Sequence, residues 1–238
     1  MFPERRGRIR DNARTDRGTR GTFRSSGGHT MIDEFNPDEH RSLVDSWLRE
    51  YVSVGDRRIG RSGPVCPFVP RALNEHALET HIRYDIDGSD EPELIDALQT
   101  EIREFGAAGH QPRSSGVLLD SWLIVMPRMG PDGWERLDAA YERLKDFAVQ
   151  SGLMVGQFHP NCDERAFRNS GFRVSIAPVA LLAIRHMAPH DVLFLHDSER
   201  WFRVYHSRFH TYFERGRVRD PLLLSLYRRA RDRHGLSA

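Results

Sequence analysis

An apolar run bounded by glycines, residues 152–162, is the segment that most constrains the fold. It reads GLMVGQFHPNC, and such a run predicts a buried strand that ends where proline removes a backbone donor. His159 and Cys162 therefore follow the end of this strand, where a polar side chain can reach a pocket. Earlier in the chain, the segment VCPF at 65–68 again sets a thiol, Cys66, beside a proline. We expect these two segments to face one site.

Alternating helical and strand patterns predict a single α+β domain. We expect strands at 81–86, 117–126, 153–158 and 178–187, and helices at 37–55, 70–79, 90–105, 132–151, 198–215 and 220–234. Capping side chains and prolines at the expected helix starts support these ranges. This order of elements favours a small mixed β-sheet with helices packed on one face, a ferredoxin-like variant. The strands at 117–126 and 153–158 should be neighbours, joined by the helix at 132–151.

The first 30 residues differ in composition from the rest of the chain. They are rich in Arg, Gly, Ser and Thr and have almost nothing to bury, which predicts a disordered arm at 1–30 in front of one domain at 31–238. An upstream extension with Met31 as an alternative start, or an arm for nucleic acid or a membrane surface, would explain it. The formal net charge is only +1, which argues against nucleic acid as a partner of the whole chain.

Cysteine content and hydropathy indicate a cytoplasmic protein. Cys66 and Cys162 are the only cysteines, too few for a disulfide scaffold. No apolar run approaches the roughly 20 residues of a spanning helix, and the first residues lack the apolar core of a secretory signal. We therefore expect reduced thiols and no membrane partner.

Cys66 and His159 are the main candidates for iron ligands. A cysteine thiolate can bind heme iron, and the proline after it stiffens the chain. The alternatives are a buried structural cysteine at 66 and a histidine at 159 that only hydrogen-bonds the following loop. Cys162 could share the pocket or be an inert buried thiol. His159 and Cys162 also resemble half a zinc site, without a second cysteine pair to complete it.

Further candidates lie in the C-terminal third of the chain. Arg185 falls inside an apolar strand and needs a partner, either a ligand carboxylate such as a heme propionate or a protein Asp or Glu. His186 follows it directly. His206 and His210 are four residues apart on an expected helix and could chelate a metal, or form a structural pair. The chain has no P-loop, GxGxxG, GxSxG or HExxH motif, which disfavours nucleotide-binding, hydrolase and zincin functions.

The motifs CPF at 66–68, GLMVGQFHP at 152–160 and the segment from Ala177-Pro178 to Met187 resemble the YqcI/YcgG-like proteins, or a close uncharacterised relative that shares these signatures. The resemblance spans roughly Phe35 to Phe213. Some YqcI/YcgG-like members are heme-dependent oxygenases that hydroxylate nitrogen, including the guanidine of arginine. The resemblance thus implies a heme, with Cys66 or His159 as the ligand of its iron. In that case Arg185 could hold a propionate, and His186 could donate to bound oxygen or substrate.

The expected function is therefore a heme-dependent oxygenase of small-molecule (secondary metabolite) biosynthesis, a monooxygenase that hydroxylates a nitrogen of an amino-acid-like substrate. It would use molecular oxygen or peroxide and a reductant. The alternatives are a non-enzymatic heme sensor or carrier, a His-ligated enzyme with non-heme iron or zinc, and a protein-interaction module. A homodimer would use an exposed helix face formed by Trp201, Tyr205 and Phe209.

Overall fold

A computed structural model of the chain describes residues 36–112 and 117–236, all within one compact unit, Ile32–Ala238. The arm expected at 1–30 and the start at Met31 lie outside the described residues. The helices are α1 (Pro37–Trp47), α2 (Val69–Asn74), α3 (Glu91–Ala107), α4 (Pro131–Gln150), α5 (Val192–Leu195), α6 (Glu199–Glu214) and α7 (Pro221–Arg233), with the short turns η1 (Leu48–Val52), η2 (Arg57–Ile59) and η3 (Pro189–Asp191). The strands are β1 (Leu78–Ile82), β2 (Ser121–Val125), β3 (Leu153–Phe158), β4 (Arg165–Ala166), β5 (Asn169–Arg173) and β6 (Leu181–His186).

Four strands form a mixed sheet in the order β1-β2-β6-β3. β1 and β2 are parallel, and β6 runs antiparallel to both of its neighbours. β1, β2 and β3 therefore point the same way, and α3 and α4 are the helices that return the chain between them. β4 and β5 form a separate hairpin. The predicted α+β class and mixed sheet are confirmed.

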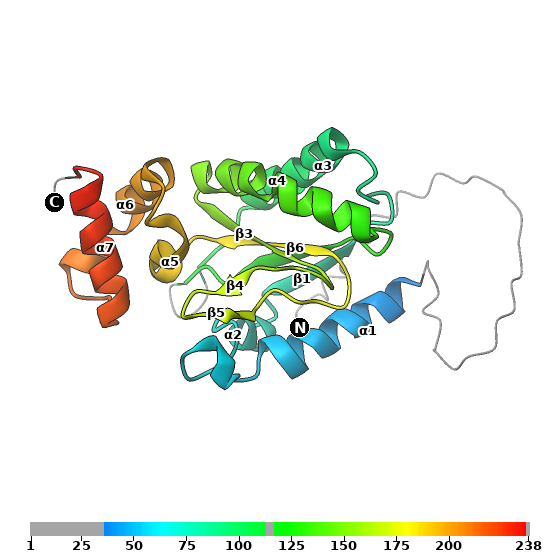
Figure 1. Cartoon of the computed structure of the whole chain (residues 1–238), viewed down its shortest axis with the longest axis horizontal. Helices are drawn as coiled ribbons and strands as arrows, with labels where there is room; N and C mark the ends of the chain where they lie inside the picture. The colour runs from blue at the N-terminus through cyan, green and yellow to red at the C-terminus, as the bar shows by residue number, and fades with distance from the viewer. Residues whose placement is uncertain (1–35, 113–116, 237–238) are drawn as a thin grey trace, which may run out of the picture. The chain divides into compact units, whose positions relative to one another are not determined.

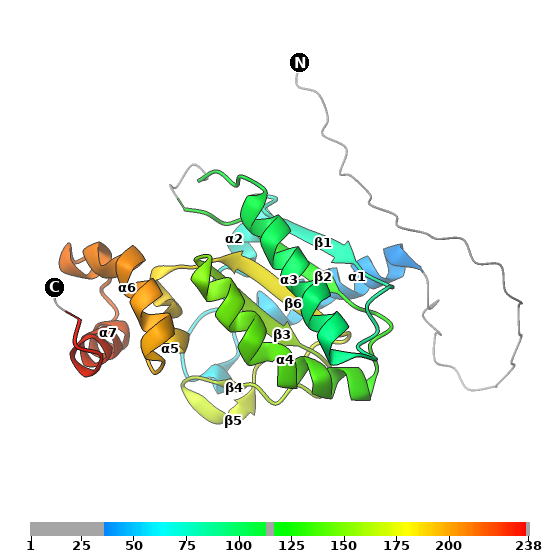
Figure 2. The same cartoon turned by 90° about the horizontal axis from the view of Figure 1, so that it is seen from above.

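Two apolar layers cover the sheet, because alternate side chains of each strand face opposite sides. Ile124, Leu182 and Val155 pack with α3 and α4, whereas Leu123 and Leu181 pack with α1 and η1. Figure 1 shows α3 and α4 on one face and α1 and α2 on the other, and Figure 2 shows α3 and α4 side by side over the sheet. Helices thus lie on both faces and not on one.

Three further expectations differ from the structure. The order of elements in the sheet is β-α-β-α-β-β, which is not the β-α-β-β-α-β order of a ferredoxin-like fold. β2 and β3 share a sheet, but β6 lies between them, so they are not neighbours. The range 161–171, which lies between the expected strands and was assigned neither strand nor helix, contains β4 and the start of β5.

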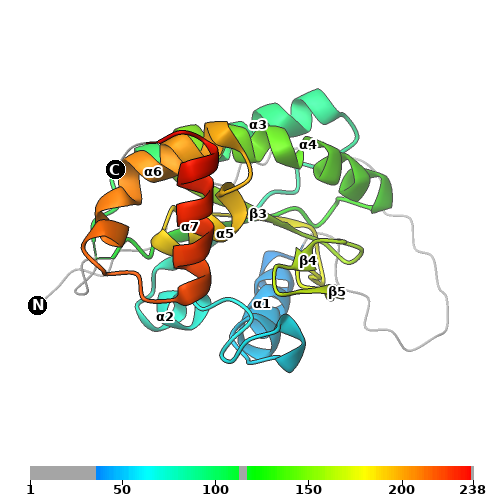
Figure 3. The ribbon, with the colours of Figure 1, turned by 60° about the vertical axis from the view of Figure 1, so that its left-hand side comes forward.

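The C-terminal helices pack on one another and on the end of the sheet (Figure 3). Phe202 and Tyr205 of α6 are fully buried there, with Tyr227 of α7 against them. Because Tyr205 is buried, the face proposed for a homodimer is already part of the core. None of the described helices is long and apolar enough to cross a membrane.

Candidate functional site

A cavity of about 650 Å³ extends around the free edge of β3, on the side of the sheet that carries α1 and α2. This volume lies within the roughly 300–1,000 Å³ typical of cofactor and small-molecule sites. The segment before α2, the hairpin, α4 and α5 all contribute to its wall. The side chains that the argument below uses are Arg61, Cys66, Phe68, Tyr141, Lys145, Gln157, Glu164, Arg185 and His190.

Cys66 lies in the cavity wall as a free, half-buried cysteine. Its amide donates a 3.0 Å hydrogen bond to the carbonyl of Val52, which anchors it to the end of η1. Pro67 follows directly and limits the backbone at this point. The thiol is therefore held at a defined position facing a cavity large enough for a cofactor.

Arg185 leaves β6 on the same side and pairs with Asp191, whose side chain is 0% exposed. The two ends of the guanidinium lie 2.6 and 2.8 Å from the two carboxylate oxygens, a bidentate pair. The guanidinium carbon also lies 4.5 Å from the ring centre of Phe68, and both Arg185 and Cys66 line the cavity. The partner required for this arginine is thus a protein carboxylate.

His190 contributes a neutral imidazole to the cavity wall. Its ring lies against Phe68 with a 4.4 Å separation between ring centres and a tilt of 35° between the ring planes. Burial lowers the pKa of His190 to about 4, in spite of the nearby Asp191 carboxylate. At neutral pH it can therefore both donate and accept a hydrogen bond.

Polar side chains from α4 and the hairpin form the opposite part of the wall. Lys145 donates to the carbonyl of Phe194, and desolvation lowers its pKa. Partial desolvation raises the pKa of Glu164, although the residue keeps contact with solvent. Tyr141 donates a 3.0 Å hydrogen bond to the carbonyl of Val155 on the outer edge of β3. The cavity thus has a carboxyl group and an ammonium group in a largely apolar lining.

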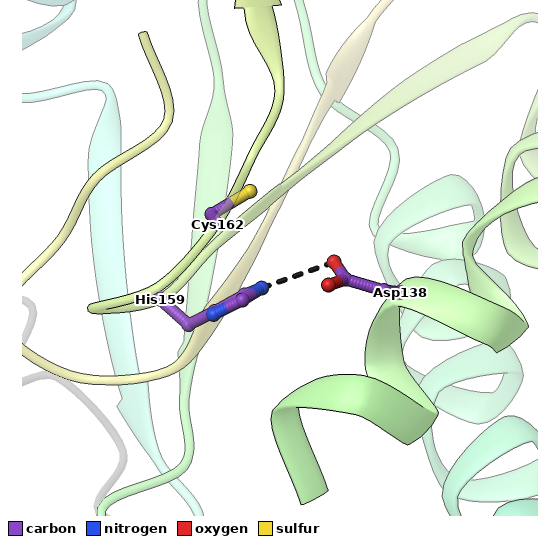
Figure 4. A group of neighbouring side chains, drawn as sticks. All are labelled: Asp138, His159 and Cys162. Atoms are coloured by element: carbon purple, nitrogen blue, oxygen red, sulfur yellow. Dashed lines mark hydrogen bonds and ion pairs between the residues drawn. The ribbon is translucent and has the colours of Figure 1, made fainter. Parts of the chain in front are cut away.

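A second cluster lies at the end of β3 and faces α4 (Figure 4). His159 is 1% exposed and donates from Nε2 to Oδ1 of Asp138 at 3.0 Å. Cys162 follows in a tight turn, with its amide donating to the carbonyl of His159, and is fully buried. One ligand-capable atom from each of Asp138, His159 and Cys162 lies within 4.8 Å of the others.

Two buried polar atoms, one of them in this cluster and one beside it, lack a hydrogen-bond partner among the described residues. Burial raises the pKa of the Cys162 thiol to about 11, so the thiol is neutral at physiological pH. Gln157 donates 2.7 Å to the same Oδ1 of Asp138, but its own Oε1 is buried without a hydrogen-bond partner. Nδ1 of His159 is likewise buried without a partner, while its ring stacks on Trp134. The cluster is incompletely satisfied by the described protein atoms.

Cys66 and His159, expected to face one site, lie on different sides of the sheet. Cys66 packs on the layer that contains α1, whereas His159 bonds to α4. Within the described part of the chain, His159 is not among the residues that line the cavity. The structure instead brings Cys66 together with Arg185, and His159 together with Cys162.

The other predicted histidines have partners of their own. His186 shares a 3.1 Å hydrogen bond with His110, on the face of the sheet away from the cavity, and burial lowers its pKa to about 4. His206 bonds through Nδ1 to the hydroxyl of Tyr227 at 2.8 Å. His210 bonds to the carbonyl of His206. These contacts place His206 in the packing between α6 and α7, while His210 bonds within α6.

The sequence alone did not identify five of the side chains at these sites, namely Asp138, Gln157, Glu164, His190 and Asp191. The signal for Asp138 lies in helical spacing, because Trp134 and Asp138 are four residues apart and share one face of α4. That face meets the end of β3, where His159 stands. Asp191 carries a weaker signal, as an acidic residue just beyond the strand that contains an arginine.

Comparison with known proteins identifies a family and nothing more specific. No curated protein matches the chain, and no solved structure matches it. The resemblance to the YqcI/YcgG-like proteins therefore stays a prediction. The family described as Domain of unknown function (DUF6875) matches residues 41–220, a range that includes nearly all of the cavity wall, the cluster at the end of β3 and most of the fold, and the chain belongs to that family.

Proposed function

We propose that the chain is a heme-dependent oxygenase that hydroxylates a nitrogen of a small, amino-acid-like molecule, with the heme in the cavity and Cys66 as its protein ligand. The observation that carries this proposal is the free thiol of Cys66 in the wall of a cavity of about 650 Å³. Cysteine thiolate is a recognised axial ligand of heme iron. His159 is set aside as the ligand because it is buried against α4.

The residues of the cavity suit a heme in three respects. The lining is mainly apolar, as a porphyrin face requires, and its volume is in the range of cofactor sites. Arg61 also lines the cavity, and its guanidinium bonds to backbone carbonyls and to no acidic side chain of the described residues. It is therefore a better candidate for a propionate than Arg185, which Asp191 already neutralises.

Bound heme would supply the activation of oxygen or peroxide. The protein's own residues would then hold and orient the substrate. His190, neutral at physiological pH, can donate a hydrogen bond into the cavity without bringing a charge. Glu164 can pair with a cationic amine or guanidinium of the substrate, and the surrounding apolar wall excludes water. We place this reaction in the cytoplasm, with a separate reductant as partner.

The test is the spectrum of the full-length chain expressed with ample iron and heme precursor. We expect a Soret band and, for the ferrous-CO form, the red-shifted band that thiolate ligation gives. Cys66→Ser should lose that red shift and most of the heme. Cys162→Ser is the matched control, because it removes the other thiol, which lies in the cluster facing α4, and it should keep both. A colourless protein, or a Cys66→Ser variant with an unchanged spectrum, would refute the heme site.

Turnover separates an oxygenase from a heme sensor or carrier that uses the same cavity. Purified protein with heme, a reductant and oxygen should convert amino-acid-like amines or guanidines into N-hydroxylated products, detected by mass spectrometry as a gain of one oxygen atom. Glu164→Gln should raise KM for a cationic substrate more than it lowers kcat, since its role is binding. Heme binding without any such product would favour the carrier.

A further inference from the structure

The cluster at the end of β3 contains a carboxylate, an imidazole and a thiol that take no part in the cavity or in the proposed heme site. Asp138 comes from α4, while His159 and Cys162 come from the turn that follows β3. Figure 4 shows the imidazole, the thiol and the carboxylate gathered between this turn and the helix. Carboxylate, imidazole and thiol are the three side-chain classes that bind Zn²⁺ in proteins.

We propose that Asp138, His159 and Cys162, none of which lines the cavity, form a second metal site for a borderline-soft divalent ion such as Zn²⁺. The site would fasten the turn after β3 to α4.

The donor set favours zinc over other divalent ions. A thiolate and an imidazole disfavour Mg²⁺ and Ca²⁺, which prefer oxygen ligands. Zn²⁺ accepts sulfur, nitrogen and oxygen together and imposes no geometry beyond a tetrahedral preference. Copper and iron ions would accept the same ligands, and elemental analysis of the purified protein distinguishes them from zinc.

The distances require only small adjustments, with Asp138 and His159 moving slightly apart and Cys162 moving closer. Ligand atoms of a tetrahedral zinc ion lie about 3.5 Å apart, and here Nε2 of His159 is 3.0 Å from Oδ1 of Asp138, with all three ligand atoms within 4.8 Å of one another. The side chain of Asp138 is 43% exposed and can swing without disturbing the core. The ion would replace the proton that His159 and Asp138 now share.

Gln157 provides independent support for a bound ion. The residue is only 8% exposed, and its Oε1 is buried without a partner while its amide nitrogen donates to Asp138. A buried amide oxygen without a hydrogen bond costs about 1–3 kcal/mol. The amide nitrogen of Gln157 now faces Asp138, and rotation of the amide by half a turn would bring Oε1 to that side. An ion held next to Asp138 would then give this oxygen a partner, and Gln157 or water could complete four ligands.

The test is zinc binding by the full-length chain, produced without an affinity tag, after extensive dialysis. We expect one Zn²⁺ per chain by elemental analysis, and a zinc X-ray absorption spectrum with one sulfur at about 2.3 Å and nitrogen or oxygen at about 2.0–2.1 Å. Because the chain has two cysteines, Cys162→Ser should remove the sulfur signal, while Cys66→Ser should retain it.

Asp138→Asn keeps the test decisive if Cys162→Ser fails to fold, since Asp138 lies at the surface. Losing a direct ligand should weaken Zn²⁺ binding by at least about 100-fold in calorimetric titration, more than an outer-sphere change usually costs. Asp163→Asn is the matched control, an exposed carboxylate next to Cys162 that pairs with Arg165, and it should leave affinity unchanged. Equal affinity in Asp138→Asn and wild type, or zinc without a sulfur neighbour, would overturn the site. The Soret band should be the same in both Asp variants, so failure of this proposal is separable from failure of the heme proposal.

Discussion

Removing the charge of Asp191 should destabilise the fold more than any surface change in the chain. Asp191→Asn keeps the shape of the side chain but leaves the guanidinium of Arg185, whose side chain is 21% exposed, without its counter-ion. The carboxylate also accepts from the amide of Ala188 at 2.7 Å, so three hydrogen bonds depend on it. Breaking one partner of a buried ion pair costs about 3–5 kcal/mol. For a domain of this size, that loss lowers Tm by roughly 6–20 °C.

Urea unfolding followed by circular dichroism and tryptophan fluorescence measures this change. Glu199→Gln is the control, since it breaks an ion pair with Arg203 on the surface of α6, and it should not move the midpoint measurably. The double variant Arg185→Met/Asp191→Asn should be more stable than the sum of the single changes predicts, because neither charge is then left alone. If Asp191→Asn unfolds at the same urea concentration as Glu199→Gln, the pair does not stabilise this domain and the reasoning fails.

Two other perturbations test the packing of the domain. The free energy of unfolding should fall as pH drops from about 6.5 to about 4, because the fold lowers the pKa of His190 to about 4 and the unfolded chain therefore binds more protons in that window. The loss from this residue is about 3 kcal/mol at most. Thermal melts of His190→Gln should therefore show a shallower pH dependence than those of the wild type. Gly133→Ala should destabilise the domain by about 1–3 kcal/mol, because a Cβ there would lie 2.5 Å from Cγ of Met129. Gly106→Ala on α3 is the control, since its Cβ meets only an ordinary 3.6 Å contact, and it should be neutral or stabilising. Equal midpoints for the two variants in chemical denaturation would contradict the close approach at Gly133.

Local sequence patterns were sufficient for much of the fold. Strand β3 was predicted residue for residue, because its glycine boundaries and apolar run are local signals. Asp90 and Asp220 cap α3 and α7 as expected. The hairpin of β4 and β5 escaped prediction because its strands are short and polar and show no regular alternation. The insertion of β6 between β2 and β3 depends on long-range pairing, which no local pattern encodes.

The candidate site shows the same division. The turn from His159 to Cys162 is local, so their proximity could be expected. Period-two alternation places residue 159 on the same face as 153 and 155, but the sequence does not say that α4 covers this face and Cys66 the other. The mistaken pairing of Cys66 with His159 followed from that missing information. The partnership of Arg185 with Asp191 was one of two open alternatives, and only the folded chain distinguishes them.

The outer edge of β3 has a consequence for how this domain behaves among other proteins. An uncovered edge strand is a template for pairing with another chain. Here the hydroxyl of Tyr141 donates to the carbonyl of Val155 on the side of β3 that faces no other strand of the sheet, and both residues line the cavity. Tyr141→Phe would free that carbonyl while leaving the ring in place. The side chain that shapes the wall of the cavity thus also closes one pairing position on the edge of the sheet, and a mutation made to enlarge the cavity at Tyr141 would leave that carbonyl open to another donor.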